Sequence, residues 1–233
     1  MRYGLVMPAA GGGARFGGAT PKQHLPLAGA SVLETALRPF LDDARCAAIA
    51  LVLAGEDPQR VPLRRQLPAK VLFAAGGALR SHSVLSGLEI LEGCLHADDW
   101  VLVHDAARPC LSPDDLQRLL DRGADSPAGA LLAAPVADTV KEGDSGDCVV
   151  RTVPRQHLWR ALTPQMFRLA ELRAALGAAR ANGREPTDES QAIEWQGKRP
   201  LLVAAADQNP KITTAGDLAL AAAILASRKE SQR

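Results

Sequence analysis

The chain has 233 residues, of which 47% are hydrophobic and 3% aromatic, and its formal net charge is +1. A chain of this length can bury a full core, but its near-neutral charge excludes the broad basic surface with which proteins bind nucleic acids or anionic membranes. No apolar run reaches the roughly 18 residues of a membrane helix, so we expect a soluble, cytoplasmic protein with no nucleic-acid and no membrane partners.

Short apolar runs alternate with helical patterns along the chain. The runs have the length and composition of buried strands, and they cover residues 3–7, 49–53, 71–74, 100–104, 130–136 and 200–205. Helix start signals stand between them, at Ser31 with Glu34, at Ser112 and at Thr214. We therefore expect one α/β domain over residues 1–233, with a Rossmann-like, mainly parallel sheet flanked by helices.

The first strand leads into a glycine-rich segment, MPAAGGGARFGGATPKQ, at residues 7–23. Glycines let backbone N–H groups approach a phosphate closely. A Walker A loop is excluded because no lysine follows Gly17 directly, and a dinucleotide fingerprint is excluded because Phe16 replaces its third glycine. Arg15 and Lys22 remain, and two cations suit a triphosphate and the charge that builds at an attacked phosphorus. The alternative is a loop with two solvated cations.

Residues 138–156 interrupt the alternation of strands and helices. Two β-prone segments flank a polar turn at residues 142–147, which predicts a hairpin. The segment carries too few apolar residues to fold alone. We expect it to project as an arm and to pack against another surface, such as a second subunit.

Six short motifs resemble those of a known family. In chain order they are Pro8-Ala-Ala-Gly11 with Arg15 and Pro21-Lys22-Gln23, Gly76-Gly77-Ala-Leu-Arg80 with Ser83, His104-Asp105-Ala-Ala-Arg108-Pro109, Thr163-Pro-Gln165, Thr187-Asp188-Glu189, and Asn209-Pro-Lys211. Together they resemble the 2-C-methyl-D-erythritol 4-phosphate cytidylyltransferases. The resemblance implies transfer of CMP from CTP to 2-C-methyl-D-erythritol 4-phosphate, with Mg²⁺, to give 4-diphosphocytidyl-2-C-methyl-D-erythritol and pyrophosphate in non-mevalonate isoprenoid biosynthesis.

The resemblance also implies roles for particular residues. The catalytic cations are Arg15, Lys22 and Lys211. The nucleotide is expected to contact Ala9, Ala10, Gly11, Gly12, Gly76, Gly77, Ser83 and Asp105. The acceptor phosphate is expected to contact Asp105, Arg108, Thr139, Arg155 and Thr163. In the family the arm reaches across a two-fold dimer, so Thr139 and Arg155 are expected to serve the neighbouring subunit of a homodimer.

Two carboxylates are candidate Mg²⁺ ligands. Asp105 follows an apolar strand, where a loop carboxylate can take Mg²⁺ or ribose hydroxyls. Asp207 is a second candidate, although a lone carboxylate in a loop is more often a solvated turn residue. His82 and His104 lie inside motifs, but a histidine at a strand end or in the first turn of a helix is more often structural.

Other functions stay open on the residues alone. The same fold and CTP site could serve another polyol phosphate, such as ribitol 5-phosphate, because acceptor choice depends on few contacts. A non-catalytic nucleotide-binding domain is a further alternative, since a fold does not determine function. The sequence also departs from the family pattern at Ala78, where an acid is common, and at Pro210, which restricts the backbone before Lys211.

Overall fold

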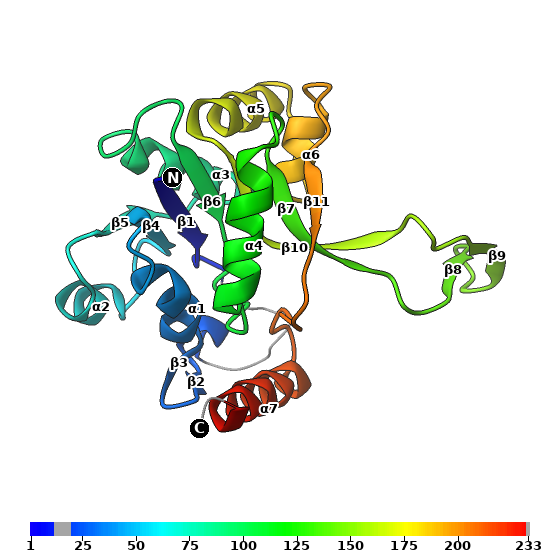
Figure 1. The fold of residues 1–233 in the computed structure, drawn as a ribbon, viewed down its shortest axis with the longest axis horizontal. Coiled ribbons are helices and arrows are strands. Elements are labelled where there is room, and N and C mark those ends of the chain that lie inside the picture. The colour runs from blue at the N-terminus through cyan, green and yellow to red at the C-terminus, as the bar shows by residue number, and fades with distance from the viewer. Residues whose placement is uncertain (12–19, 232–233) are drawn as a thin grey trace.

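The structure is a computed structural model and describes residues 1–11 and 20–231 (Figure 1). Its helices and strands, in chain order, are β1 (Tyr3–Pro8), the 3₁₀ helix η1 (Lys22–His24), β2 (Pro26–Leu27), β3 (Ala30–Ser31), α1 (Val32–Leu41), β4 (Cys46–Leu53), α2 (Arg60–Gln66), β5 (Val71–Ala75), α3 (Arg80–Leu91), β6 (Trp100–Val103), α4 (Pro113–Ala124), β7 (Ala130–Pro135), β8 (Val140–Gly143), β9 (Val149–Val153), β10 (Trp159–Arg168), α5 (Leu169–Ala181), α6 (Glu189–Glu194), β11 (Leu201–Ala204) and α7 (Ala215–Ser231).

A seven-stranded sheet forms the centre of the fold, in the order β11-β7-β10-β6-β1-β4-β5. β1 runs parallel to β4 and β6, β4 to β5, and β7 to β11. Each apolar run predicted as a strand corresponds to one of these elements: β1, β4, β5, β6, β7 and β11. The expected α/β fold with a mainly parallel sheet is confirmed.

The strand β10 is the member of the seven-stranded sheet that the sequence pattern did not predict. It lies between β6 and β7 and is antiparallel to both. Its sequence, WRALTPQMFR, contains Pro164 and two polar residues, Thr163 and Gln165, which are buried in the structure. Proline normally argues against a central strand, and here the pairing with β7 shifts register between Ala161 and Gln165.

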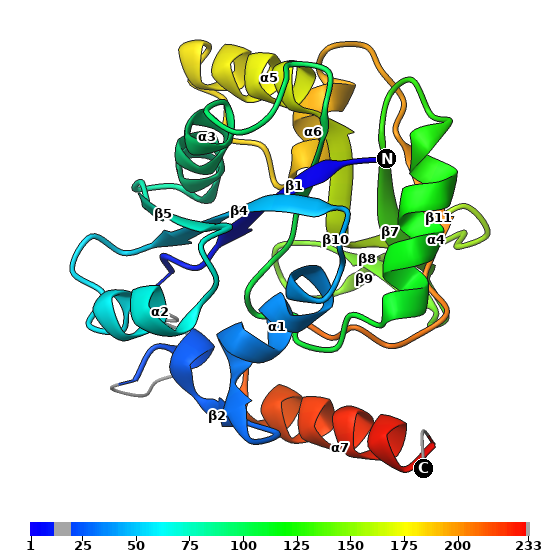
Figure 2. The ribbon, with the colours of Figure 1, turned by 60° about the vertical axis from the view of Figure 1, so that its left-hand side comes forward.

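Helices cover both faces of the sheet (Figure 2). Successive side chains of a strand point to opposite faces, and β1 follows this rule. Leu5 and Met7 belong to one buried cluster with residues of α1 and α4, whereas Val6 belongs to a second cluster with residues of α3, α5 and α6. Packing on both faces fixes the strands, and the carboxyl ends of the parallel strands, all but β10, lie along one edge of the sheet.

The predicted helix caps are present. The Ser31 hydroxyl accepts from the backbone N–H of Glu34 in a capping box, and Ser112 accepts from the N–H of Asp115. At the last helix, Thr214 accepts from the N–H of Asp217. A third buried cluster ties α7 to the start of α1 and to the segment after β11, so the C-terminal helix braces the segment that carries Lys211.

The hairpin arm projects away from the sheet (Figure 1). Its paired strands are β8 and β9, within the predicted residues 138–156. Val149 and Val150 are 64% and 59% exposed, as expected for a segment that has no core of its own. Among the described residues, no helix is both long and apolar enough to cross a lipid bilayer.

Candidate active site

A cavity of about 360 Å³ opens at the carboxyl edge of the sheet. Its walls are the end of β1, the helix η1, the turn between β5 and α3, the segment after β6, and Lys211. Crevices outside the carboxyl ends of parallel strands are the usual ligand sites of open α/β sheets. The predicted site residues that line this cavity are Ala9, Ala10, Gly11, Lys22, Gly77, Ser83, Asp105 and Lys211. Gly12 and Arg15 lie outside the described residues.

The turn at residues 76–83 needs its glycines. A Cβ on Gly76 would lie 2.2 Å from the Cβ of Ala10, and a Cβ on Gly77 would lie 2.5 Å from the Cβ of His82. Distances under 3 Å do not occur between such atoms. Gly77 donates its N–H to the Ser83 hydroxyl at 3.1 Å. Ser83 therefore stiffens the turn from inside the cavity, which places backbone groups where a base edge can be read.

Gln23 holds the opposite wall of the cavity. It is buried, and its Nε2 donates to the carbonyl of Ala9 at 2.9 Å. The neighbouring Lys22 is half-buried, and its Nζ donates to the carbonyl of Ile212 at 2.8 Å. Because Ile212 also donates its N–H to the carbonyl of Ala107 at 2.8 Å, the segments that carry Lys22, Asp105 and Lys211 are joined.

Asp105 is the centre of a charged cluster. Its Oδ1 accepts from Nε and Nη2 of Arg80 at 3.1 and 3.0 Å, and its Oδ2 lies 2.8 Å from Nζ of Lys211. Nε of Arg108 is 3.8 Å from Oδ2. Burial alone would raise the pKa of Asp105, but Arg80, Lys211 and Arg108 together hold it well below its ordinary value. Asp105 is thus ionised throughout the neutral pH range.

Arg80 also contacts a second acid. Its Nη1 and Nη2 donate to the two oxygens of Glu189 at 2.6 and 3.1 Å. The sequence analysis assigned no role to Gln23, Arg80 or Glu189. Each of them lies inside one of the six motifs, which was the signal in the sequence that could have identified them. Nothing local indicated that Arg80 and Glu189, 109 positions apart, would pair.

A ring of hydrogen bonds fixes the expected acceptor residues. Nη1 of Arg108 donates to the carbonyl of Asn209 at 2.8 Å, and Nδ2 of Asn209 donates to the carbonyl of Thr163 at 3.1 Å. The Thr163 hydroxyl lies 2.9 Å from Nδ1 of His104, whose Nε2 lies 3.0 Å from the carbonyl of Arg108. A carbonyl can only accept, so Nε2 carries the proton and Nδ1 accepts from Thr163. The backbone N–H of Asp105 donates to Thr163 at 3.1 Å.

Acidification is expected to destabilise the protein through His104. Burial lowers the pKa of His104 from its ordinary value of 6.5 to about 4. Between these two values the unfolded chain binds a proton that the folded protein does not, so stability falls as the pH falls, by about 3 kcal/mol in total. Urea unfolding of the wild type and of His104→Gln at about pH 7 and about pH 4.5 tests this. The same pH dependence in both proteins would contradict it.

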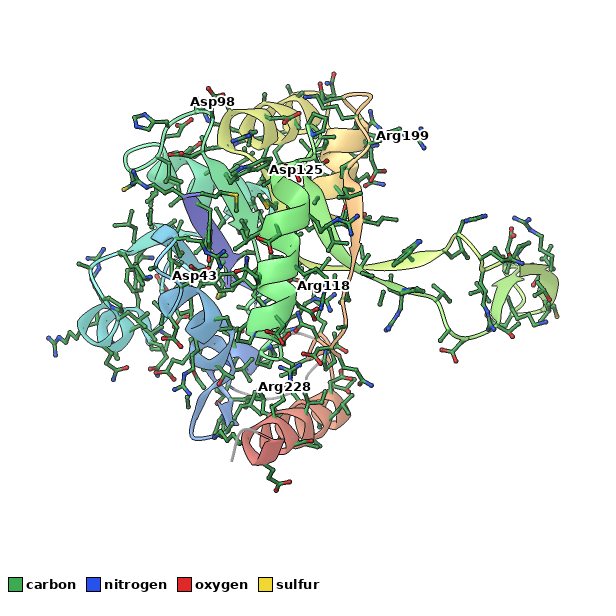
Figure 3. The ribbon with its side chains drawn as sticks, in the orientation of Figure 1. Asp43, Asp98, Arg118, Asp125, Arg199 and Arg228 are labelled. Atoms are coloured by element: carbon green, nitrogen blue, oxygen red, sulfur yellow. The ribbon has the colours of Figure 1, made fainter. Side chains whose placement is uncertain are left out.

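Six of the predicted residues that the structure describes do not line the cavity. Gly76 and Arg108 are next in sequence to lining residues and Thr163 is hydrogen-bonded to Asp105, whereas Thr139, Arg155 and Asp207 lie away from the cavity. Thr139 and Arg155 are exposed, at the base of the arm, and do not line it. Asp207 is absent from the lining as well, and its carboxylate lies 3.5 Å from Nη2 of Arg228 on α7, which Figure 3 labels. Among the described residues, no three or more His, Cys, Asp or Glu side chains are grouped so that they could hold a metal ion.

An α/β sheet that brings a glycine turn, two lysines and a buried carboxylate to one cavity is the arrangement of a nucleotidyltransferase. The family model of IspD, 2-C-methyl-D-erythritol 4-phosphate cytidylyltransferase, matches residues 4–227, and the chain belongs to this family. A curated member from Acidithiobacillus ferrooxidans is 52% identical over 98% of both chains. One from Halorhodospira halophila is 47% identical over 98% of this chain and 96% of its own.

Solved structures agree with the family assignment. A crystal structure of 4-diphosphocytidyl-2C-methyl-D-erythritol synthase superposes with a TM-score of 0.83 at 33% identity, covering 96% of this chain and 98% of the other. The 2-C-methyl-D-erythritol 4-phosphate cytidylyltransferase of Francisella tularensis gives a TM-score of 0.81 at 32% identity, covering 96% of this chain and all of the other. The fold and the family are therefore the ones that the motifs predicted.

Proposed function

We propose that this chain transfers CMP from CTP to 2-C-methyl-D-erythritol 4-phosphate, forming 4-diphosphocytidyl-2-C-methyl-D-erythritol and pyrophosphate. The observation that carries the proposal is the meeting of Lys22, Lys211 and Asp105 in one cavity with the glycine turn at residues 76–83. The family membership names the same reaction. Because the reaction consumes a nucleoside triphosphate, we expect it to take place in the cytoplasm.

The chemistry needs positive charge rather than a general base. An oxygen of the acceptor phosphate is already anionic at neutral pH, and it attacks the α-phosphorus of CTP. A bond forms between that oxygen and the α-phosphorus. The bond from the α-phosphorus to the oxygen that bridges the α- and β-phosphates breaks, and pyrophosphate leaves with the electron pair. Catalysis of this kind consists of positioning and charge neutralisation. Lys22 and Lys211 are the described cations that line the cavity with Arg80, and Arg15 is a further predicted one.

The cytosine is best accommodated by the stiff turn. The backbone N–H groups of Ala9, Gly76 and Gly77 already donate within the protein, to Val52, Leu53 and Ser83. The base would therefore be read mainly by carbonyl oxygens of this turn and by the backbone of Ala10, held in fixed positions because Gln23 and Ser83 brace both sides. Hydrogen-bonding sites of this kind reject ligands that leave their groups unpaired. The departure at Ala78 leaves such backbone contacts intact.

Arg108 and Thr163 suit the acceptor phosphate. The hydrogen-bond ring holds both beside Asp105. Nε of Arg108 is buried and has no hydrogen-bond partner among the described residues. A buried donor without a partner is costly, and a phosphate oxygen of the acceptor would satisfy it. This deficit supports an anion at that place.

The arm suits a homodimer. Thr139 and Arg155 are exposed at its base, and the tip presents Val149 and Val150 to solvent. In a two-fold dimer, the tip of each arm would pack against the partner subunit. Thr139 and Arg155 would then lie on the acceptor side of the partner's cavity. An isologous contact of this kind uses the same surface twice.

Mg²⁺ fits the cavity as a companion of the nucleotide. Mg²⁺ is usually bound through one or two carboxylates together with substrate phosphates, and Asp105 is the carboxylate among the residues that line the cavity. The ion would neutralise charge on the triphosphate. Asp207, the second predicted ligand, has no support from the cavity lining and stays a prediction.

Replacing Arg155 with alanine is expected to raise KM for the acceptor phosphate by about tenfold, because a charge-assisted hydrogen bond to the phosphate is lost. CTP affinity should change little. Arg151→Ala is a matched control, since Arg151 lies on the same arm and pairs with Glu142. A large loss of CTP affinity in Arg155→Ala would assign this residue to the nucleotide instead.

Acceptor choice is tested by product analysis. The enzyme is incubated with CTP, Mg²⁺ and either 2-C-methyl-D-erythritol 4-phosphate or ribitol 5-phosphate, and the diphosphate product is identified by ³¹P NMR. Product from the first acceptor alone supports the proposal. Product from ribitol 5-phosphate alone would contradict the proposed acceptor, and binding of CTP without any product would favour a non-catalytic domain.

A further inference from the structure

Glu189 is a buried acid that the proposed reaction does not use. Its exposed fraction is 1%, and it does not line the nucleotide cavity. A buried carboxylate is costly unless it is paired. Its oxygens accept from Nη1 and Nη2 of Arg80 at 2.6 and 3.1 Å. The contact of Glu189 with the cavity therefore runs through Arg80.

Arg80 connects Glu189 to the site. It lines the cavity, and its Nε and Nη2 donate to Oδ1 of Asp105 at 3.1 and 3.0 Å. Every nitrogen of the guanidinium thus has a carboxylate partner. The group is planar and its donors have fixed directions, so holding one edge on Glu189 also orients the edge that faces Asp105.

The two oxygens of Asp105 consequently have different surroundings. Oδ1 is held by Arg80, which is anchored on both sides. Oδ2 lies 2.8 Å from Nζ of Lys211, whose side chain is 40% exposed. Nε of Arg108 is 3.8 Å from Oδ2, which is too far for a hydrogen bond. A lysine on a flexible stem can move to a phosphate oxygen when a triphosphate enters, whereas Arg80 stays with Glu189. Oδ2 is then the atom of Asp105 that becomes available.

We propose that Glu189 is a positioning residue: it holds Arg80 on Oδ1 of Asp105 and so reserves Oδ2 for the cation that accompanies the bound nucleotide. This inference rests on the proposed function. Without the charge of Glu189, the guanidinium of Arg80 would be drawn to the triphosphate or would turn across both oxygens of Asp105. Oδ2 would lose its defined role.

Hydrogen bonds hold the segment that carries Glu189 rigidly, as a positioning role requires. Asp188 caps α6 by accepting from the N–H of Gln191 at 2.9 Å. Gln165 of β10 donates to Asp188 at 2.9 Å and accepts from the N–H of Ser190 at 2.8 Å. The motif at residues 187–189 therefore links the central strand β10 to the pair of Glu189 and Arg80.

The test compares Glu189→Gln with a matched control, Glu185→Gln. Glu185 accepts from the hydroxyl of Ser81, the neighbour of Arg80, at 2.8 Å, so its replacement removes the same charge nearby. Titration calorimetry measures CTP binding without a divalent ion, and then Mn²⁺ binding to the CTP complex. In Glu189→Gln we expect Mn²⁺ binding to weaken by about tenfold, as when a residue that holds a metal ligand in place is lost, while metal-free CTP binding stays close to the wild type. Tm is expected to fall, because a buried ion pair is broken. Glu185→Gln should match the wild type in both titrations.

Unchanged Mn²⁺ binding in Glu189→Gln would overturn the proposal. An equal loss of metal-free CTP affinity would overturn it as well, because it would indicate a salt bridge that serves only the structure. A double variant controls for misfolding caused by an unpaired buried charge. Arg80→Gln with Glu189→Gln leaves no unpaired charge from this pair, and it should bind Mn²⁺ as Arg80→Gln does, because Glu189 acts only through Arg80. Additive losses would contradict that. Failure of the wild type to bind CTP would contradict the proposed function, and the positioning role with it.

Discussion

Replacing Lys22 with alanine is expected to lower kcat by about 10²-fold or more, while CTP affinity changes by only about threefold. Lys22 lines the cavity, and its Nζ rests on the carbonyl of Ile212 at 2.8 Å. A lysine held by a carbonyl can transfer to a phosphate oxygen, where its charge matters most as pyrophosphate departs. An interaction that strengthens in the transition state contributes to kcat rather than to ground-state binding.

The measurement combines steady-state kinetics with calorimetric titration of CTP. Lys198→Ala serves as the control, because Lys198 pairs with Glu171 and does not line the cavity. It removes the same charge and should retain wild-type kcat. Equal losses of kcat and CTP affinity in Lys22→Ala would mean that Lys22 binds the ground state as strongly as the transition state.

The Asp105→Asn variant is expected to lose both activity and stability. Asp105 is 7% exposed and faces Arg80, Lys211 and Arg108. Asparagine keeps the shape but removes the buried charge, so the partly buried Arg80 and Arg108 and the more exposed Lys211 lose this partner. Breaking a buried ion pair in this way costs about 3 kcal/mol or more, and loss of the site's carboxylate should reduce kcat/KM by about 10²-fold or more.

Urea unfolding and kinetics on the same protein sample measure the two losses. Asp121→Asn, at an exposed position of α4, removes a carboxylate outside the cavity and should behave as the wild type. Full activity of Asp105→Asn would contradict its place in the site. Full stability would mean that the cations around Asp105 are well solvated without it.

Much of the fold could be predicted from local patterns. The apolar runs and the capping residues Ser31, Ser112 and Thr214 each act within a few residues of chain, so a linear reading finds them. β10 was missed because its stability comes from its two neighbours in the sheet rather than from its own composition. Thr163 and Gln165 are buried in it because their side chains serve the site and α6.

The residues of the candidate site could also be predicted only in part. Lys22, Ser83, Asp105 and Lys211 were predicted through motifs, and the structure brings them to one cavity. What could not be predicted is the pairing among motifs. The contact of Arg80 with Glu189 and the ring through Asn209 depend on how distant segments meet at the sheet edge. Such contacts carry no local signature, because the same residues could equally face solvent.

The most direct test of the account is pyrophosphate release by the purified chain with Mg²⁺, 2-C-methyl-D-erythritol 4-phosphate and each of CTP, ATP, GTP and UTP. We expect release with CTP that depends on the acceptor and is largely lost in Lys22→Ala. Release that is independent of the acceptor, or equal with all four nucleotides, would contradict a cytidylyltransferase built on this cavity.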